Sequence, residues 1–303
     1  MKKLAKDILS KHFYDLYFRL SIREQLHQKE KNKNHLINKF GFRSFVELDT
    51  ISHKKSDTLF IMGSGNSINY IDFFEWNHIK NNDSLGINSW IIHDHIATFY
   101  MFEMSRDPET AKLYIDILDK KCKEFKSTPF ILKSYNYNTF NDYKLPEIIS
   151  RNIYLPNDIE IPIRHIKNMK RAFSYIENYD GKNFATERDL LWKSRASISM
   201  AIFFAFYAGY KNIVLCGVDL NNTKYFYDID RSYYEQKGLR IGQTGQSGEI
   251  HKTMRSELSR ITIDKVIYEI DTFLKKKGVN LYVQSKKSAL YPKIKHYNYK
   301  THL

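Results

Sequence analysis

Short apolar runs alternate along most of the chain with longer segments in which apolar residues recur at helical spacing. The runs are rich in β-branched and aromatic residues, as is typical of buried strands, and they cover 58–62, 84–88, 97–101, 130–132, 212–216 and 279–283. Helices are predicted over 108–123, 197–208 and 253–277. Strands that alternate with helices predict an α/β fold, with a mainly parallel, Rossmann-like sheet and helices on both faces.

Shifts in composition divide the chain into three predicted parts. A basic helical N-terminal extension covers 1–56, a main domain covers 57–290, and a basic tail covers 291–303. Two segments of the main domain are irregular and are predicted to form a small lid, at about 138–190 and 220–250.

The first 30 residues have apolar side chains at helical spacing and basic side chains between them. Two interpretations stay open. The helix docks on the body of the protein, or it lies as a basic amphipathic helix on an anionic membrane surface, with Phe13, Tyr14, Tyr17 and Phe18 on its apolar face. The Lys- and Asn-rich segment at 28–39 is predicted to be a solvated connection.

Composition narrows the class of protein. With 42% hydrophobic and 15% aromatic residues in 303, the chain can bury a sizeable core, which argues against wholesale disorder. Two cysteines form neither a disulfide scaffold nor a zinc cluster. No apolar run approaches the ~20 residues of a spanning helix, and no secretory signal is recognisable, so a cytoplasmic protein is expected. A net charge of +14 favours an anionic partner.

The clearest candidate for chemistry is the turn Gly63-Ser64-Gly65-Asn66-Ser67, which directly follows a predicted strand. Such a turn lets backbone N–H groups approach a phosphate at a helix N-terminus. The alternative is an ordinary tight turn. No Gly-Lys-Ser/Thr follows, so this is not a Walker A loop, and the third glycine of the dinucleotide fingerprint is missing.

Other polar residues follow other predicted strands, and in a parallel sheet they meet at the same edge. Asn88-Ser89 follows one strand and Gly217-Val218-Asp219 another. Asp219 is placed either to accept hydrogen bonds from ribose hydroxyls or to close an Asx-turn. His251 ends a Gly/Gln/Ser-rich stretch and suits a general base near neutral pH, with a solvent-facing helix-cap neighbour as the alternative.

Asp228 and Asp230 resemble the Asp-X-Asp pair by which many nucleotide-sugar transferases hold a divalent metal. Two carboxylates supply only part of an octahedral shell, and we give this pair little weight. A basic nucleic-acid-binding protein is a further alternative, but there is no compact Lys/Arg stripe with interleaved aromatic residues, so no nucleic acid is expected.

Together these residues resemble, in order and spacing, the bacterial sialyltransferases of glycosyltransferase family 42. The resemblance runs from about residue 58 to 290. It rests on the glycine turn, Asn88, the helix start at Arg195-Ala196-Ser197, the segment 209–219, Tyr225 and His251.

The resemblance implies an inverting, metal-independent transferase that takes N-acetylneuraminic acid from CMP and needs no cofactor. Its implied partners are the CMP-sugar donor and a cell-surface glycan or glycolipid acceptor. The basic residues concentrated in 1–40 and 286–300 separately favour peripheral contact with an anionic membrane, expected to be the inner membrane. A homo-oligomer is left open. The resemblance implies that Ser64 and Ser67, with main-chain amides of the turn, bind the phosphate and the nucleotide, and that Gly217 and Asp219 bind the nucleoside. Asn88, Ser89 and Ser197 are implied to bind the donor sugar. Tyr225, with Arg195 nearby, is implied to stabilise the departing phosphate, and His251 to act as the catalytic base.

Several positions depart from the family pattern. Ser64 stands where the family usually has Asn, Asn66 where it has Pro, and Asn221 in place of a second phosphate-binding tyrosine. Arg195 is one position away from the family's arginine. The departures that affect the sugar keep other donors open: CMP-activated pseudaminic or legionaminic acid, or CMP-Kdo.

Overall fold

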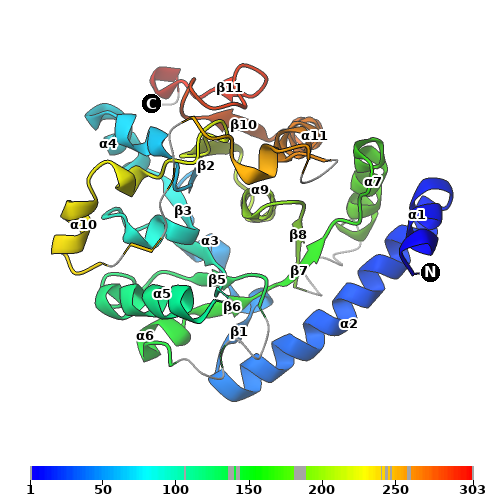
Figure 1. Ribbon diagram of the computed structural model, residues 1–303, viewed down its shortest axis with the longest axis horizontal. Coiled ribbons are helices and arrows are strands. Elements are labelled where there is room, and N and C mark those ends of the chain that lie inside the picture. The colour runs from blue at the N-terminus through cyan, green and yellow to red at the C-terminus, as the bar shows by residue number, and fades with distance from the viewer. Residues whose placement is uncertain are drawn as a thin grey trace.

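A nine-stranded sheet in which every neighbouring pair of strands is parallel forms the centre of the molecule (Figure 1). The computed structural model describes residues 2–301 except 106, 136–139, 141–143, 181–188, 240, 243–244, 246–247 and 258–260. Across the sheet the strands are β1 (Arg43–Ser44), β6 (Ile153–Leu155), β5 (Phe130–Leu132), β4 (Phe99–Phe102), β3 (Asp83–Ile87), β2 (Thr58–Met62), β9 (Asn212–Cys216), β10 (Asn280–Val283) and β11 (Lys295–His296). The predicted α/β class is confirmed.

The direction of winding reverses between β2 and β9. From β2 the chain proceeds outward through β3, β4, β5 and β6, and it then returns to place β9, β10 and β11 on the other side. Met62 and Cys216 are paired in register at the ends of these two central strands. In an open parallel sheet, the crevice beyond such a reversal is where ligands bind.

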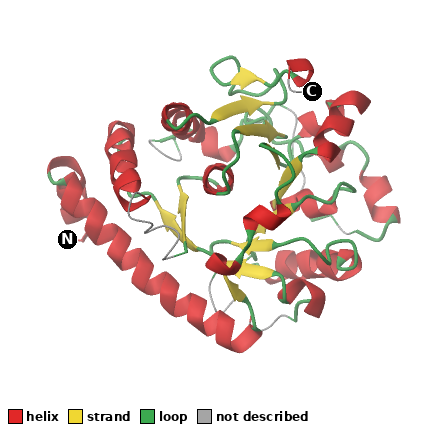
Figure 2. Cartoon of the chain, turned by 180° about the vertical axis from the view of Figure 1, so that it is seen from behind, coloured by secondary structure: helices red, strands yellow, loops and turns green. Residues whose placement is uncertain are grey.

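Helices cover both faces of the sheet, as the apolar periodicity predicted (Figures 1 and 2). Alternate residues of each strand point to opposite faces, so Leu59 and Ile61 of β2 join one apolar core, and Phe60 and Met62 join the other. The first core is completed by α2 (Tyr14–Phe40), α7 (Met169–Asp180), α9 (Ser197–Tyr207) and α11 (Ile263–Lys276). The second is completed by α4 (Phe73–Asn81), α5 (Pro108–Lys121), α6 (Glu147–Ser150) and α10 (Arg231–Gln236). Two further helices are α1 (Lys2–His12) and α3 (Thr50–His53).

The long helix predicted at 253–277 starts late. A short 3₁₀ turn, Lys252–Met254, follows His251, and α11 begins only at Ile263, with Thr262 at its N-cap. Nδ1 of His251 lies 2.8 Å from the Thr253 hydroxyl and 3.4 Å from the Thr253 backbone nitrogen, and the ring so closes this turn locally; with the proton on Nδ1 donated to the hydroxyl, Nε2 is the acceptor nitrogen. Leu258, which the predicted helix included, lies outside the described residues.

The N-terminal extension is part of the main body in the structure. The predicted solvated connection at 28–39 is wrong, because α2 continues as one helix to Phe40. Lys29 forms an ion pair with the buried Asp158, and Lys33 does so with the buried Asp189. These basic side chains therefore tie the helix to the body instead of solvating a linker.

The predicted lid and tail also join the body. Residues 153–155 of the lid segment form β6 of the main sheet, and β7 (Asn157–Glu160) pairs with β8 (Leu190–Lys193) in a separate two-stranded parallel sheet. In the tail, Ile294 and Tyr297 are fully buried. At each edge of the nine-stranded sheet lies a strand of only two residues, β1 and β11.

Among the described residues, no helix is both long and apolar enough to cross a bilayer.

Candidate functional site

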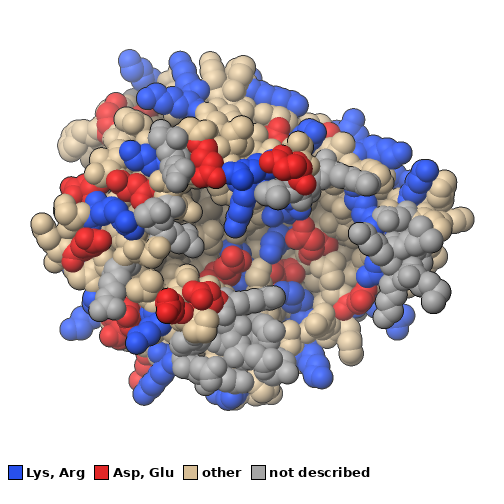
Figure 3. Space-filling model, in the orientation of Figure 1, with Lys and Arg blue, Asp and Glu red and all other residues tan. Residues whose placement is uncertain are grey.

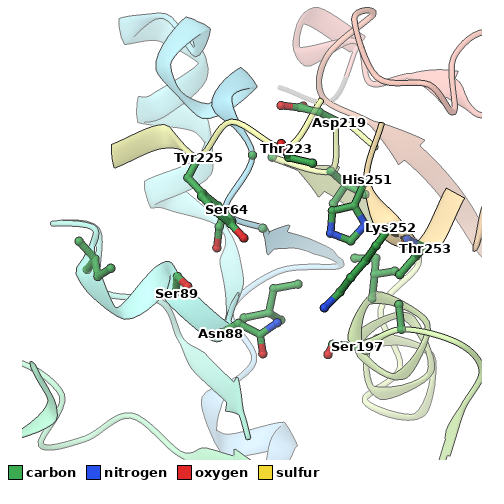
Figure 4. A pocket seen from close by; sticks show the side chains of 18 of the residues that line it. Ser64, Asn88, Ser89, Ser197, Asp219, Thr223, Tyr225, His251, Lys252 and Thr253 are labelled. Carbon is green, nitrogen blue, oxygen red and sulfur yellow. Dashed lines mark hydrogen bonds between the residues drawn. The ribbon is translucent and has the colours of Figure 1, made fainter. Parts of the chain in front are cut away.

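A pocket of about 540 Å³ opens at the point where the sheet reverses direction (Figure 4). That volume suits a ligand the size of a nucleotide or larger. Its walls come from segments that are far apart in the chain: 63–65 after β2, 87–89 and 91–92 at and beyond the end of β3, 193 and 195–198 at the start of α9, 217–220 and 222–225 after β9, and 251–253. The pocket therefore lies beyond the carboxyl ends of the strands, where the sequence analysis expected a ligand to bind.

The glycine turn after β2 packs against the turn after β9. The N–H of Gly63 donates to the carbonyl of Cys216 over 2.7 Å, and the N–H of Gly65 donates to the carbonyl of Gly217 over 2.9 Å. A Cβ on Gly63 would lie 2.6 Å from the Gly217 oxygen, and one on Gly65 would lie 2.7 Å from the same atom. The approach of one loop to the other thus requires glycine at both positions, whether or not a ligand is bound.

Most main-chain amides of the turn, which were predicted to bind a phosphate, donate hydrogen bonds within the protein. Besides Gly63 and Gly65, the N–H of Asn66 donates to the Lys224 carbonyl over 3.0 Å, and the N–H of Ser67 donates to Oδ2 of Asp219 over 3.0 Å. Groups already bonded within the protein are not available to a phosphate. The Ser64 side chain is the polar group that this turn presents to the pocket (Figure 4).

Three predicted site residues lie outside the pocket lining. Asn66 bonds to Asn69 and, with its amide group, to Tyr70, while Asn221 donates to the carbonyl of Lys287. Ser67 is 4% exposed and is buried behind the turn. Asp219 does reach the lining, but its Oδ2 accepts the N–H of Ser67 and so joins the turn after β9 to the turn after β2, a contact that is not the Asx-turn offered as the alternative.

Asn88 takes up a left-handed backbone conformation, with φ of 52°, directly after β3. Its carbonyl accepts a bond from the Tyr100 hydroxyl, which in turn accepts the N–H of Ile91 over 3.1 Å. This holds the strained residue in place. The side-chain oxygen of Asn88 is buried and has no hydrogen-bond partner among the residues that the structure describes, and the side chain, like that of Ser89, lines the pocket (Figure 4).

The start of α9 forms the lower wall in Figure 4. Ser197 is its first residue and turns its hydroxyl to the cavity. Arg195, which also lines the pocket, has a left-handed φ of 67°, and its N–H donates to Glu160 over 2.9 Å. Both predicted residues are therefore brought to the site.

His251 faces Ser64 and Tyr225 across the cavity (Figure 4). The backbone N–H of His251 donates to the carbonyl of Leu220 over 3.0 Å, and the ring nitrogen Nδ1 is hydrogen-bonded to the hydroxyl of Thr253 at 2.8 Å. These contacts fix the ring and leave Nε2 available. Burial lowers the pKa of His251, and the nearby charges of Lys252 and Arg255 lower it further. The imidazole is therefore neutral at neutral pH, the state that a general base requires.

Tyr225 lies beside Ser64 on the opposite wall (Figure 4). Burial raises the pKa of its phenol, and Asp228 adds to the effect, so the hydroxyl keeps its proton at neutral pH. Its ring stacks on that of Tyr227, with ring centroids 5.0 Å apart. Tyr227 also lines the pocket and was missed by the sequence analysis.

Lysine side chains make the pocket cationic. Lys193, Lys224 and Lys252 line it, and Lys252, which the sequence analysis also missed, extends its ammonium into the middle of the cavity (Figure 4). Burial alone would raise the pKa of Glu103, the carboxylate on the floor, but Lys133, Lys193 and Lys252 lower it overall. Lys133 pairs with that carboxylate at 2.7 Å. Figure 3 shows Lys and Arg side chains projecting into the central hollow of this face.

Asp228 and Asp230 cap local structure. Asp228 accepts the N–H groups of Tyr225 and Gly245, and Asp230 accepts that of Tyr233 at the start of α10. Neither residue lines the pocket. Within the part of the chain that the structure describes, no group of three or more His, Cys, Asp and Glu side chains is placed to hold a metal ion.

Comparison of the chain with protein-family models, with curated proteins and with solved structures gives no match.

Proposed function

We propose that the protein is an inverting glycosyltransferase that moves sialic acid, or a related 2-keto acid sugar, from a CMP-activated donor to a glycan or glycolipid acceptor. One observation carries the proposal. A neutral, fixed imidazole, His251, faces a hydroxyl pair, Ser64 and Tyr225, across a cationic pocket at the point where the parallel sheet reverses.

The leaving group would lie on the wall of Ser64 and Tyr225. Most amides of the glycine turn are bonded within the protein, so on this wall the phosphate of CMP would meet the hydroxyl-bearing side chains of Ser64 and Tyr225. Protonated phenol and serine hydroxyls directed at a group that gains negative charge stabilise the transition state. Tyr227, stacked on Tyr225, would hold that ring in place.

The sugar would lie over Asn88 and Ser197, toward Lys252. The ammonium of Lys252 suits the carboxylate that all these donor sugars carry on the reacting carbon. The carboxamide of Asn88, whose oxygen has no hydrogen-bond partner among the described residues, suits a sugar hydroxyl or amide N–H.

The reaction is a single displacement. The bond between the anomeric carbon and the phosphate oxygen breaks, and its electron pair leaves with CMP. The acceptor oxygen bonds to the same carbon from the opposite face, which inverts it, and His251 takes the acceptor's proton on Nε2. This account involves no metal ion or other cofactor. The reaction would take place on the cytoplasmic side, at the inner membrane if the acceptor is a glycolipid.

Nucleotide binding is the direct test. At a concentration a hundred times the dissociation constant, CMP should stabilise the protein by about 2.7 kcal/mol, which raises the melting temperature by several degrees. CDP, UDP and GDP should shift it less. Equal shifts with UDP or GDP, or none with CMP, would contradict the proposal. A CMP-release assay across CMP-activated sialic, pseudaminic and legionaminic acids and Kdo then identifies the sugar, and the same assay with EDTA tests whether a metal is needed.

Replacing Lys252 should separate sugar binding from nucleotide binding. We expect Lys252→Ala to raise the KM for the CMP-sugar roughly tenfold, the effect of losing one charge-assisted contact, while CMP affinity changes little. The acidic limb of the pH–rate profile should move up toward pH 6.5, because one of the charges that disfavour the protonated imidazole has been removed. Lys252→Arg keeps the charge and serves as the control. An unchanged KM and an unchanged limb in Lys252→Ala would show that this ammonium does not contact the donor.

A further inference from the structure

The N-terminal helices carry exposed apolar side chains on their outer side. Lys6 of α1 pairs with Glu24 of α2 at 3.2 Å, so α1 folds back along α2, with Phe13 at the bend. Phe13 is 60% exposed, and Leu16 and Leu20, three and seven residues later, are each 49% exposed. This spacing places them on one side of the helix. We call Phe13, Leu16 and Leu20 the outer apolar stripe; Ile8 of α1 is also 49% exposed.

The inner side of α2 already anchors the helix to the body. Tyr14, Phe18 and Ile22 are at most 1% exposed, and Phe18 stacks on Tyr175 of α7 with ring centroids 4.9 Å apart. Of the four aromatic residues that the sequence suggested for a membrane contact, Tyr14, Tyr17 and Phe18 therefore lie on the docked face, and Phe13 lies on the outer side. Docking on the body and contact with a membrane are therefore compatible, because docking uses the inner side of α2 and leaves the outer apolar stripe exposed.

The charge of the residues around the outer apolar stripe indicates which kind of partner would bind it. The first 23 residues contain six Lys and Arg against two Asp, and Lys11, Arg19 and Arg23 are exposed near the stripe. Apolar side chains flanked by cations are the composition of helices that lie in the interface of anionic bilayers. A second copy of the chain fits less well, because a two-fold contact would place this positive surface against itself.

The position of the helices agrees with such a contact. Figures 1 and 2 show α2 running along the outer margin of the molecule, with α1 at its end. We propose that the outer apolar stripe, with Ile8 and the basic residues beside it, inserts into the headgroup region of an anionic lipid bilayer. This proposal stands independently of the reaction proposed above.

Vesicle flotation of the full chain tests it. The wild type should float with vesicles that contain phosphatidylglycerol, should stay behind with pure phosphatidylcholine, and should lose binding as salt is raised. The triple variant Phe13→Ser/Leu16→Ser/Leu20→Ser should bind the anionic vesicles at least about tenfold more weakly, because it loses most of the inserted apolar area. Ile51→Ser/Phe73→Ser is the matched control, since each of these residues is 81% exposed elsewhere on the surface, and its binding should equal that of the wild type.

A thermal melt of each variant shows whether it is folded. If the triple variant unfolds, Arg19→Glu/Arg23→Glu replaces it and should also weaken flotation. Failure of the wild type to float with anionic vesicles would overturn the proposal, as would equal flotation of the triple variant. A vesicle-free dimer that the triple variant converts to a monomer would overturn it as well, since the stripe would then bind a second copy.

Discussion

His251→Ala should lower the rate of sugar transfer by about 10²–10⁴-fold, the range that a positioned general base contributes. The affinity for CMP should stay within a factor of two, because the imidazole faces Ser64 and Tyr225 across the cavity instead of lying on their wall. CMP release with the sugar acceptor measures the rate, and calorimetry with CMP measures the affinity.

The control for this variant is His27→Ala, which removes an exposed histidine from α2 and should leave both quantities unchanged. Thr253→Val adds a graded test, since it removes the hydroxyl that holds Nδ1 of His251 and should reduce the rate less than His251→Ala does. Full turnover by His251→Ala would remove His251 from the mechanism and leave the nucleotide site to be tested separately with CMP.

Gly217→Ala should destabilise the fold by about 2–4 kcal/mol. Gly217 has a φ of +64°, where a Cβ costs about 1 kcal/mol, and an added Cβ would lie 2.7 Å from the carbonyl oxygen of Gly63. The two loops would have to separate, so CMP binding should weaken together with stability. Denaturant unfolding with and without CMP measures both.

Gly278→Ala is a matched control for this experiment. Gly278 has a similar φ of +71°, but an added Cβ there would meet nothing within 4 Å. Its cost should be about 1 kcal/mol, the backbone contribution alone. If the two variants lost equal stability, the close approach of the loops would not be what requires glycine at 217.

The central strands could be predicted because each is a short apolar run buried on both sides. Thr58–Met62 and Asn212–Cys216 have this character, and both became central strands of the sheet. The glycines at their ends were also recognised, but the reason for them was not. A single sequence does not show whether a glycine is needed so that a phosphate can approach the backbone or so that another loop can. The close contact between Gly63 and Gly217, which are far apart in the chain, shows that the second reason applies here.

The segments that were misjudged are those whose partners are distant in the chain. The lysines of 28–39 suggest a solvated linker until Asp158 and Asp189 are brought beside them. Ile153–Leu155 lies in a segment that looks irregular in sequence, yet it pairs with both β5 and β1. Local composition carries no information about such pairings.

The residues of the candidate site were also predicted only in part. Ser64, Asn88, Ser197, Tyr225 and His251 meet in one pocket, because each lies at a chain position that follows or faces a strand end. Lys252 and Tyr227 were missed, since a lysine after a histidine and one tyrosine among 22 carry no distinctive signal by themselves.

The two-residue strands at the margins of the sheet have a consequence for behaviour at high concentration. A parallel sheet that ended in long, flat strands would offer rows of open N–H and C=O groups on which another chain could add a strand. Here β1 and β11 are each two residues long, and each contributes a cation, Arg43 or Lys295. Such short, charged margins give an incoming strand almost nothing to bind, so the molecule is guarded against growth into fibrous aggregates from either side.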